Sequence, residues 1–164
     1  MEILIGLESY DDLFSDFDIR NFGERTISKD FLDEMTLRMA KVNASDKLKI
    51  IFVLTKEQRN EEYEAIIISR ISKFFSYRFT RYRQKDRKIK WLSAIFIGFG
   101  LLLLVAANFV HNLIPTLFAD FLLIPSWFFV WSGLEKYISS REKLNRKKRH
   151  YGILRVAKYE FRDK

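Results

Sequence analysis

The stretch WLSAIFIGFGLLLLVAANFV, residues 91–110, decides how this chain folds. Its twenty residues are mostly apolar, and none of them carries a charge. An α-helix of that length rises about 30 Å, which matches the thickness of the hydrocarbon core of a bilayer. We therefore predict that residues 91–110 form a helix that spans a membrane.

A second apolar stretch follows almost at once. Residues 117–134, LFADFLLIPSWFFVWSGL, hold a single charged residue, Asp120. The residues between the two stretches, 111–116, include a proline and suffice for a tight turn. Residues 91–134 are thus predicted to form a transmembrane helical hairpin. The alternative, a hairpin buried in a soluble core, is disfavoured because a chain of 164 residues has too little other apolar material to enclose it.

Charge is distributed unevenly around these stretches. The whole chain carries a formal charge of +8. Residues 1–64 have a net charge of −6, whereas residues 65–90 carry +8 and residues 135–164 carry +7. The predicted turn contains no Lys or Arg. Because basic flanks stay in the cytoplasm, we expect a multi-pass protein of the cell inner (plasma) membrane, with both termini cytoplasmic and the turn outside.

The basic side chains next to the predicted spans form two clusters. Aromatic residues interleave with the first cluster, a combination that also occurs at RNA-binding surfaces. Beside a membrane span, attraction to anionic lipid headgroups explains such a cluster better, at about 1 kcal/mol per charge. We therefore expect membrane lipids rather than nucleic acid as partners. We call these residues the basic collar: Arg78, Arg81, Arg83, Lys85, Arg87, Lys88, Lys90, Arg146, Lys147, Lys148 and Arg149.

The remaining residues predict a cytoplasmic domain of the α+β or α/β class, with about three strands and two helices. Residues 2–7 and 47–55 have the short, apolar and β-branched composition of strands. Between them, apolar residues recur at helical spacing, and Ser28 can cap a helix that runs to about Val42. We expect this domain to cover residues 1–90 and to end in a long basic helix.

A long helix is predicted to connect this domain to the first span. Thr55 and Gln58 match the spacing of a capping box, which marks a helix start. No Gly or Pro occurs between residue 24 and Gly98. Residues 57–110 are therefore predicted to form one uninterrupted helix.

The second span is also expected to continue into the cytoplasm, as a charged amphipathic helix. Gly152 is predicted to end that helix, because glycine is the preferred residue just past a helix end. Residues 153–161 then have the composition of a third strand. Residues 135–164 would in this way return to pack on the first domain.

A polar segment early in the chain is the candidate binding loop. Two Asp residues two positions apart can share a hard cation, and Arg can bind a phosphate with both arms of its guanidinium. A cation, a phosphate or a partner peptide would suit these residues. The competing interpretation is a surface loop whose charges pair with one another. The candidate ligand or partner residues are Asp16, Asp18, Arg20, Glu24 and Arg25.

Small and polar residues in the spans are candidates for helix packing or for lining a pore. Ala94 and Gly98 form a pair of small residues four positions apart, which lets membrane helices approach closely and favours homo-oligomers. Asp120 is the single charge within the spans, and Asn108 lies at a similar depth on the first span. A hydrogen bond between these two side chains would suit that depth.

The second span also contains a proline. Pro125 removes one backbone donor and is predicted to kink the helix. Ser126 follows it and has a hydroxyl group that can satisfy a freed carbonyl. A kink of this kind can serve as a hinge, but more often it only shapes the helix.

The composition excludes several classes of chemistry. The chain has no Cys and only two His. It therefore has no thiol nucleophile and no Cys-ligated metal centre, and little for a His-based triad. Phosphate-binding glycine loops, zinc-protease motifs and EF-hand spacing do not occur. We predict no catalytic residues, no cofactor and no metal, and we expect that the protein is not an enzyme.

Three segments carry a resemblance to known proteins: DFDIRNFGERTISKDFLDE (16–34), EYEAIIISRISKFFSYR (62–78) and SWFFVWSGLEKYI (126–138). In these segments the chain resembles small uncharacterised prokaryotic membrane proteins. The resemblance implies their layout, which is an N-terminal cytoplasmic domain followed by a two-span hairpin. It implies no activity.

The leading hypothesis for the function follows from this layout. We expect a homo-oligomeric membrane protein whose cytoplasmic domain binds a small ligand or a partner protein and is rigidly coupled to the hairpin. One alternative is an ion channel or membrane-disrupting effector that a cytoplasmic ligand gates. A second alternative is a membrane-bound enzyme that acts on a lipid or phosphate substrate.

Overall fold

The computed structural model describes residues 1–39, 42, 48–111 and 117–164. The chain divides into two compact units. The first unit comprises residues 1–81 and 147–164, and the second comprises residues 82–146. Two long helices, α2 (Glu61–His111) and α3 (Leu117–Val156), contribute residues to both units.

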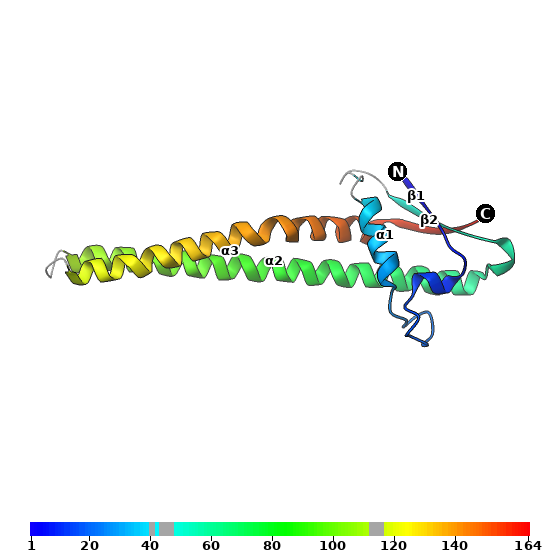
Figure 1. Ribbon diagram of the computed structural model, residues 1–164, viewed down its shortest axis with the longest axis horizontal. Helices are drawn as coiled ribbons and strands as arrows, with labels where there is room; N and C mark the ends of the chain where they lie inside the picture. Colours follow the sequence, from blue (N-terminus) through cyan, green and yellow to red (C-terminus); the bar gives the residue numbers. More distant parts are fainter. Residues whose placement is uncertain (40–41, 43–47, 112–116) are drawn as a thin grey trace. The chain divides into compact units, whose positions relative to one another are not determined.

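The first unit contains a three-stranded parallel sheet. Its strands are β1 (Glu2–Gly6), β2 (Lys49–Leu54) and β3 (Lys158–Asp163), and β2 is the central strand (Figure 1). With its helices, this sheet confirms the predicted α+β class and the three strands. Because all three strands are parallel, their carboxyl ends lie at one edge of the sheet.

Helix α1 (Lys29–Met39) connects β1 to β2, as the helical spacing predicted. The hydroxyl oxygen of Ser28 caps this helix by accepting a hydrogen bond from the backbone N–H of Asp30 at 3.2 Å. Val42, where the predicted helix ends, is buried but not helical. The buried face of α1 consists of Phe31, Met35 and Met39.

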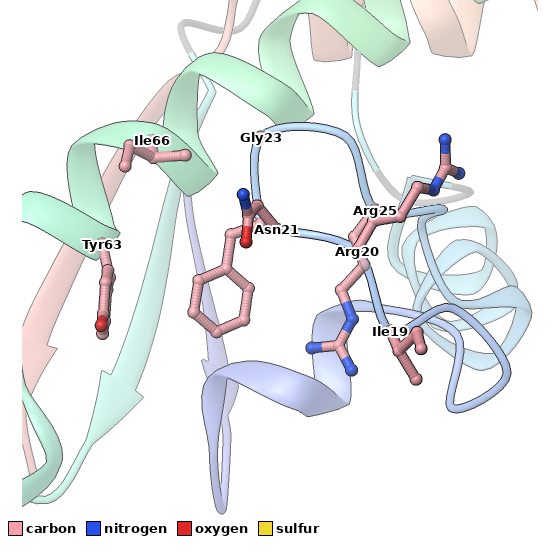
Figure 2. A pocket seen from close by; sticks show the side chains of 8 residues that line it. Ile19, Arg20, Asn21, Gly23, Arg25, Tyr63 and Ile66 are labelled. Carbon is pink, nitrogen blue, oxygen red and sulfur yellow. The ribbon is translucent and has the colours of Figure 1, made fainter.

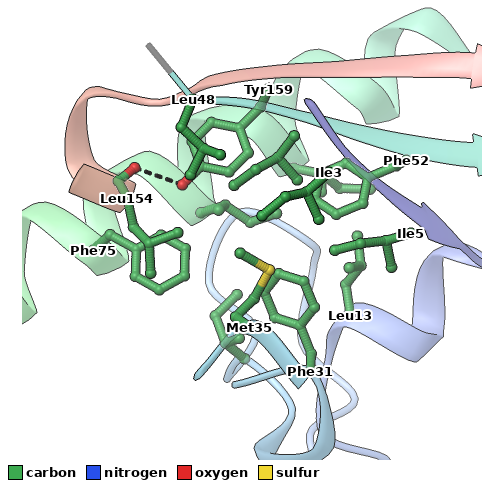
Figure 3. Packing of buried hydrophobic residues seen from close by; sticks show 14 of the residues in the cluster. Ile3, Ile5, Leu13, Phe31, Met35, Leu48, Phe52, Phe75, Leu154 and Tyr159 are labelled. Carbon is green, nitrogen blue, oxygen red and sulfur yellow. Dashed lines mark hydrogen bonds between the residues drawn. The ribbon is translucent and has the colours of Figure 1, made fainter. Parts of the chain in front are cut away.

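Large apolar side chains on one face of the sheet form the core of the first unit (Figure 3). Ile3, Ile50 and Tyr159 share one register across the three strands, and all three are buried. Phe52 is fully buried, and its ring centroid lies 6.0 Å from that of Phe31. Close packing of this kind makes the core sensitive to the loss of even a few methylene groups.

Helix α2 begins later than the capping-box pattern predicted. The carboxamide oxygen of Asn60 caps it, accepting hydrogen bonds from the N–H groups of the second and third helical residues at 3.0 and 3.2 Å. Thr55 instead donates to the side chain of Gln58 at 2.8 Å, and residues 56–58 form a single 3₁₀ turn. From Glu61 the helix runs for 51 residues without a break, as predicted.

Helix α3 does not end at Gly152, so that prediction is wrong. The helix continues to Val156, and β3 therefore begins at Lys158 rather than at residue 153. A Cβ atom at Gly152 would lie 3.2 Å from the ring of Phe79 on α2. Gly152 thus lets two helical segments of the first unit pack closely, and this contact explains the glycine without a helix end.

In the second unit, α2 and α3 contact each other through small residues. A Cβ at Gly100 would lie 2.7 Å from a methyl group of Val130, and one at Gly133 would lie 2.9 Å from the carbonyl oxygen of Ser93. The large apolar side chains of this unit are exposed instead. They include Ile95, Phe99, Leu101, Leu102, Val105, Phe109, Phe121, Ile124, Trp127, Phe128 and Trp131.

One helix in the described part of the chain is long and apolar enough to cross a membrane. This helix is Glu61–Phe109 within α2. Only 17% of its most apolar 18-residue segment is buried. This finding supports one candidate span by length and composition. The predicted second span, 117–134, belongs to α3. Of the predicted turn, 111–116, His111 is still the last residue of α2, and residues 112–116 lie outside the described part, so two crossings stay a prediction.

Candidate functional site

The predicted binding loop is a closed loop between β1 and α1. An isolated bridge between Phe14 and Ile27 closes its base, and the N–H of Ser15 donates to the carbonyl oxygen of Thr26 at 2.9 Å. The loop therefore spans residues 15–26, and we call it the 15–26 loop. Its two ends are fixed to the same core that holds the sheet.

Asp18 organises this loop from the inside. Its carboxylate accepts the Nε and Nη2 donors of Arg20 at 2.9 and 2.7 Å, and both the N–H and the hydroxyl of Thr26 at 2.8 Å. These hydrogen bonds, that from Arg20 first, hold the pKa of Asp18 well below its usual range. Asp18 is thus ionised and engaged within the loop, as the competing interpretation expected. Among the described residues, no cluster of acidic or histidine side chains could hold a metal.

Arg25 ties the loop to its surroundings. Its Nη1 donates to the carboxylate of Asp11, and its Nε donates to the backbone carbonyl oxygen of Asp18. The guanidinium also lies over two aromatic rings, 5.9 Å from the centroid of Phe14 and 5.7 Å from that of Phe22. These contacts orient the side chain on several sides at once.

A cavity of about 410 Å³ lies between the 15–26 loop and the first turns of α2 (Figure 2). We call it the loop cleft. Tyr63 and Ile66 supply its helical wall, and the ring centroids of Phe22 and Tyr63 lie 5.4 Å apart. Ile19, beside the cleft, is 93% exposed. The lining residues are Ile19, Arg20, Asn21, Phe22, Gly23, Arg25, Tyr63 and Ile66.

Helix α2 also holds the loop from outside the cleft. The guanidinium of Arg70 donates to the backbone carbonyl oxygens of Arg25 and Glu24 at 2.9 and 3.2 Å. Gly23 faces α2 closely, because a Cβ added there would lie 3.5 Å from the Ile66 side chain. The sequence pattern did not identify Arg70, because the contact joins residues 45 positions apart.

A polar cluster lies behind the cleft, at the carboxyl ends of the strands. The carboxylate of Glu64 accepts the hydroxyl of Tyr10 at 3.1 Å and two donors of Arg59 at 2.8 and 2.9 Å. Arg59 also donates to Asp163, the last residue of β3, at 2.7 Å. These carboxylates raise the pKa of Arg59, and burial raises the pKa of Tyr10. In open sheets of parallel strands, ligands bind at this edge. The sequence pattern did not identify this cluster, because the order of the strands is not known from the sequence alone.

The other residues of the predicted loop face solvent. Asp16 is exposed, and its side chain makes no hydrogen bond or ion pair with the described residues. Glu24 is exposed and contributes its backbone carbonyl oxygen to Arg70. Of the five predicted residues, Asp18 and Arg25 are therefore partly buried and hold the loop together. The other three, Asp16, Arg20 and Glu24, are exposed.

Most residues of the basic collar are exposed, and Arg78 and Lys148 are partly buried. The guanidinium of Arg78 lies 5.1 Å from the ring centroid of Phe74, and its Nε is buried without a hydrogen-bond partner among the described residues. Lys90 pairs with Asp86 at 3.2 Å. Arg149 donates to the backbone carbonyl oxygen of Val42 at 3.2 Å.

The predicted packing residues of the spans fall on different faces. Ala94 and Gly98 are exposed, and a Cβ at Gly98 would meet nothing within 4 Å. Ser126, next to Pro125 within α3, is fully buried, and its hydroxyl donates to the carbonyl oxygen of Leu122.

Two further predicted residues lie near the ends of the helices. Asn108 is exposed. Asp120 belongs to α3 by its backbone, but its side chain lies outside the described part of the chain. The predicted hydrogen bond between these side chains stays a prediction.

The chain was also compared with known proteins. No family model, no curated protein and no solved structure matches it.

Proposed function

We propose that this chain is an integral membrane protein of the inner (plasma) membrane, with both termini in the cytoplasm. It crosses the membrane twice, through residues 91–110 and 117–134. The first unit binds a small ligand or a partner protein at the loop cleft. The chain assembles into homo-oligomers, and the continuous helices couple the ligand site to the membrane segment.

The observation that carries this proposal is the burial pattern of the second unit, which is the reverse of that in a water-soluble domain. Apart from Leu144, the buried described residues of the second unit are small or polar, as with Ser93, Gly100, Ala107 and Ser126, whereas its phenylalanines and tryptophans are largely exposed. Exposed large apolar surface is unfavourable in water, by about 25 cal/mol per Å². In lipid the same surface is well solvated, and small residues at the helix contact are the usual packing solution.

Helix continuity supports the coupling. Tyr63 and Ile66 line the loop cleft, and Arg70 holds the 15–26 loop; all three belong to α2. The same helix continues without a break into the apolar stretch. A ligand that moves the loop therefore acts directly on a helix that enters the membrane.

The exposed position of Ala94 and Gly98 supports self-association. Intramolecular packing uses Gly100 and Gly133, so the other pair of small residues stays available for a second copy. By contrast, Ser93 and Ser126 are buried, and they do not supply an outward polar face for a channel. The geometry of the described residues favours neither the channel nor the enzyme alternative.

Labelling of single cysteines in intact cells tests the topology. The chain has no Cys, so every variant carries one thiol. We expect Leu113→Cys to react with a membrane-impermeant maleimide from outside. Glu57→Cys and Lys164→Cys should react only after lysis. Labelling of all three thiols in intact cells, or recovery of the chain in the soluble fraction after lysis, would contradict the proposal.

Disulfide crosslinking of the same chain tests the self-association. We expect Ala94→Cys to give a covalent dimer on oxidation in membranes. Ser93→Cys is the matched control. Ser93 is next to Ala94 in the sequence, but it is only 2% exposed, so a side chain there cannot reach another copy. Equal crosslinking of the two variants, or none of either, would rule out the proposed contact face.

A further inference from the structure

The loop cleft carries hydrogen-bond donors that no residue of the described chain uses. An Arg guanidinium has five N–H donors. Arg20 uses its Nε and one donor of Nη2 on Asp18, which leaves three donors. The side-chain amide of Asn21 has no hydrogen-bond partner among the described residues either.

The charges around the cleft are arranged for an anion. Two arginines line it, and none of the described lining residues is acidic. The two carboxylates that neutralise them, Asp18 and Asp11, bind them from outside the lining and fix their orientation. Guanidinium groups held in this way are preorganised for a phosphate, because little side-chain entropy is lost when it binds.

The rest of the lining is apolar and aromatic. Tyr63 is 46% exposed and Ile66 is 44% exposed, so both offer surface to a ligand. The ring of Phe22 contacts that of Tyr63 and continues this wall. Figure 2 shows Tyr63 and Ile66 on α2 facing the loop that carries the polar residues. A flat, apolar group can pack on this wall while an anionic group reaches the donors of the loop.

We propose that the loop cleft binds a nucleoside phosphate, with the phosphate on the free donors of Arg20 and Asn21 and the base against Tyr63 and Ile66. The proposal rests on the proposed function, because it names the ligand of the same cleft. The cavity of about 410 Å³ lies within the range of small-molecule sites. That size favours a compact ligand over a long segment of a partner protein.

The binding experiment uses the full chain in nanodiscs of neutral phosphatidylcholine. The probes are the 5′-mono- and triphosphates of adenosine, guanosine, cytidine and uridine, titrated by calorimetry. The four matching nucleosides alone and inorganic phosphate alone are separate arms. We expect at least one nucleotide to bind with a dissociation constant below about 1 mM, and more tightly than either of its parts.

Two variants connect that binding to the cleft. Asn21→Asp keeps the side-chain shape and adds a negative charge, and it should weaken the best nucleotide at least about tenfold. Ile66→Glu should do the same from the helical wall. Leu37→Glu is the matched control, because Leu37 is an exposed residue of α1 that does not line the cleft. It should leave the affinity unchanged.

Three results would overturn the proposal. No binding by any nucleotide of the panel is the first. Equal binding to the wild type, Asn21→Asp and Ile66→Glu is the second, because it would assign the signal to the basic collar. Binding of an acidic, tyrosine-containing peptide in place of every nucleotide is the third. None of them affects the thiol labelling, so a failed ligand and a failed membrane topology can be distinguished.

Discussion

The two units of the chain solve opposite packing problems. In the first unit, large apolar side chains such as Phe52, Phe75 and Leu54 are buried in a core. In the second unit, small residues such as Ser93, Gly100 and Ala107 are buried, whereas the tryptophans and most described phenylalanines are exposed. The first unit is packed as proteins are in water, and the packing of the second unit is the kind expected in lipid.

The largest expected difference between the units comes from truncating a phenylalanine. Phe52→Ala in β2 should lower the free energy of unfolding of the first unit by about 3–5 kcal/mol, because it leaves a cavity in the core. Phe128→Ala is the matched change, at a side chain that is 64% exposed, and should cost less than about 1 kcal/mol. Hydrogen exchange of the strand amides in denaturant measures the first effect. Equal destabilisation by both variants would mean that Phe128 is buried in the working protein.

A charge placed on each surface tests the solvent itself. Leu102 and Leu37 are similarly exposed, at 64% and 69%, but belong to different units. Leu102→Arg should oppose membrane insertion by about 2.5–3.5 kcal/mol, whereas Leu37→Arg should change nothing measurable. Carbonate extraction of membranes, followed by immunoblotting, reports the inserted fraction. Full insertion of Leu102→Arg would argue against lipid around the second unit.

Two neighbouring glycines sharpen the comparison at the helix contact. Gly100→Ala places a methyl group within 2.8 Å of the backbone of α3, so the two helices must separate. We expect a loss of about 1–3 kcal/mol of helix packing, seen as a lower thermal midpoint in dilute detergent. Gly98→Ala serves as the control, because its methyl group would meet nothing within 4 Å. The reverse order of midpoints would mean that the helices pack through another face.

The smallest expected effect is local and depends on pH. The pKa of Asp18 is lowered by Arg20 and Thr26, so its contribution to stability is complete above the unfolded value of about 3.9. That contribution is lost as the pH falls through the lower folded-state pKa. Exchange of the Thr26 amide should therefore speed up only in strong acid. Asp18→Asn should exchange faster at neutral pH, with no further acid step; an unchanged rate would show that Asp18 does not brace the loop.

Periodicity and composition could predict the elements but not all of their limits. The strands β1 and β2, the Ser28 cap and the unbroken α2 follow from patterns within a few residues. Gly152 misled the prediction, because a glycine at a helix end and a glycine at a close helix contact look alike in one sequence. The difference lies in the ring of Phe79, which is distant along the chain.

The candidate site shows the same limit more strongly. The polar composition of residues 16–25 predicted a loop rich in ion pairs, and Asp18 indeed pairs within it. Tyr63, Ile66 and Arg70 read only as parts of an amphipathic helix. Their second role depends on contacts with the 15–26 loop, about 45 residues earlier in the chain.

The order of the strands has a consequence for synthesis. The ion pair between Arg59 and Asp163, which joins the segment just before α2 to the end of β3, spans 104 residues of sequence. A ribosome needs about 5–20 s to add that many residues. During this time β2 has one strand neighbour instead of two, and the apolar stretch of residues 91–110 has already emerged. If the chain enters the membrane as proposed, its most hydrophobic segment is delivered to the translocation machinery while the first unit is still unfinished.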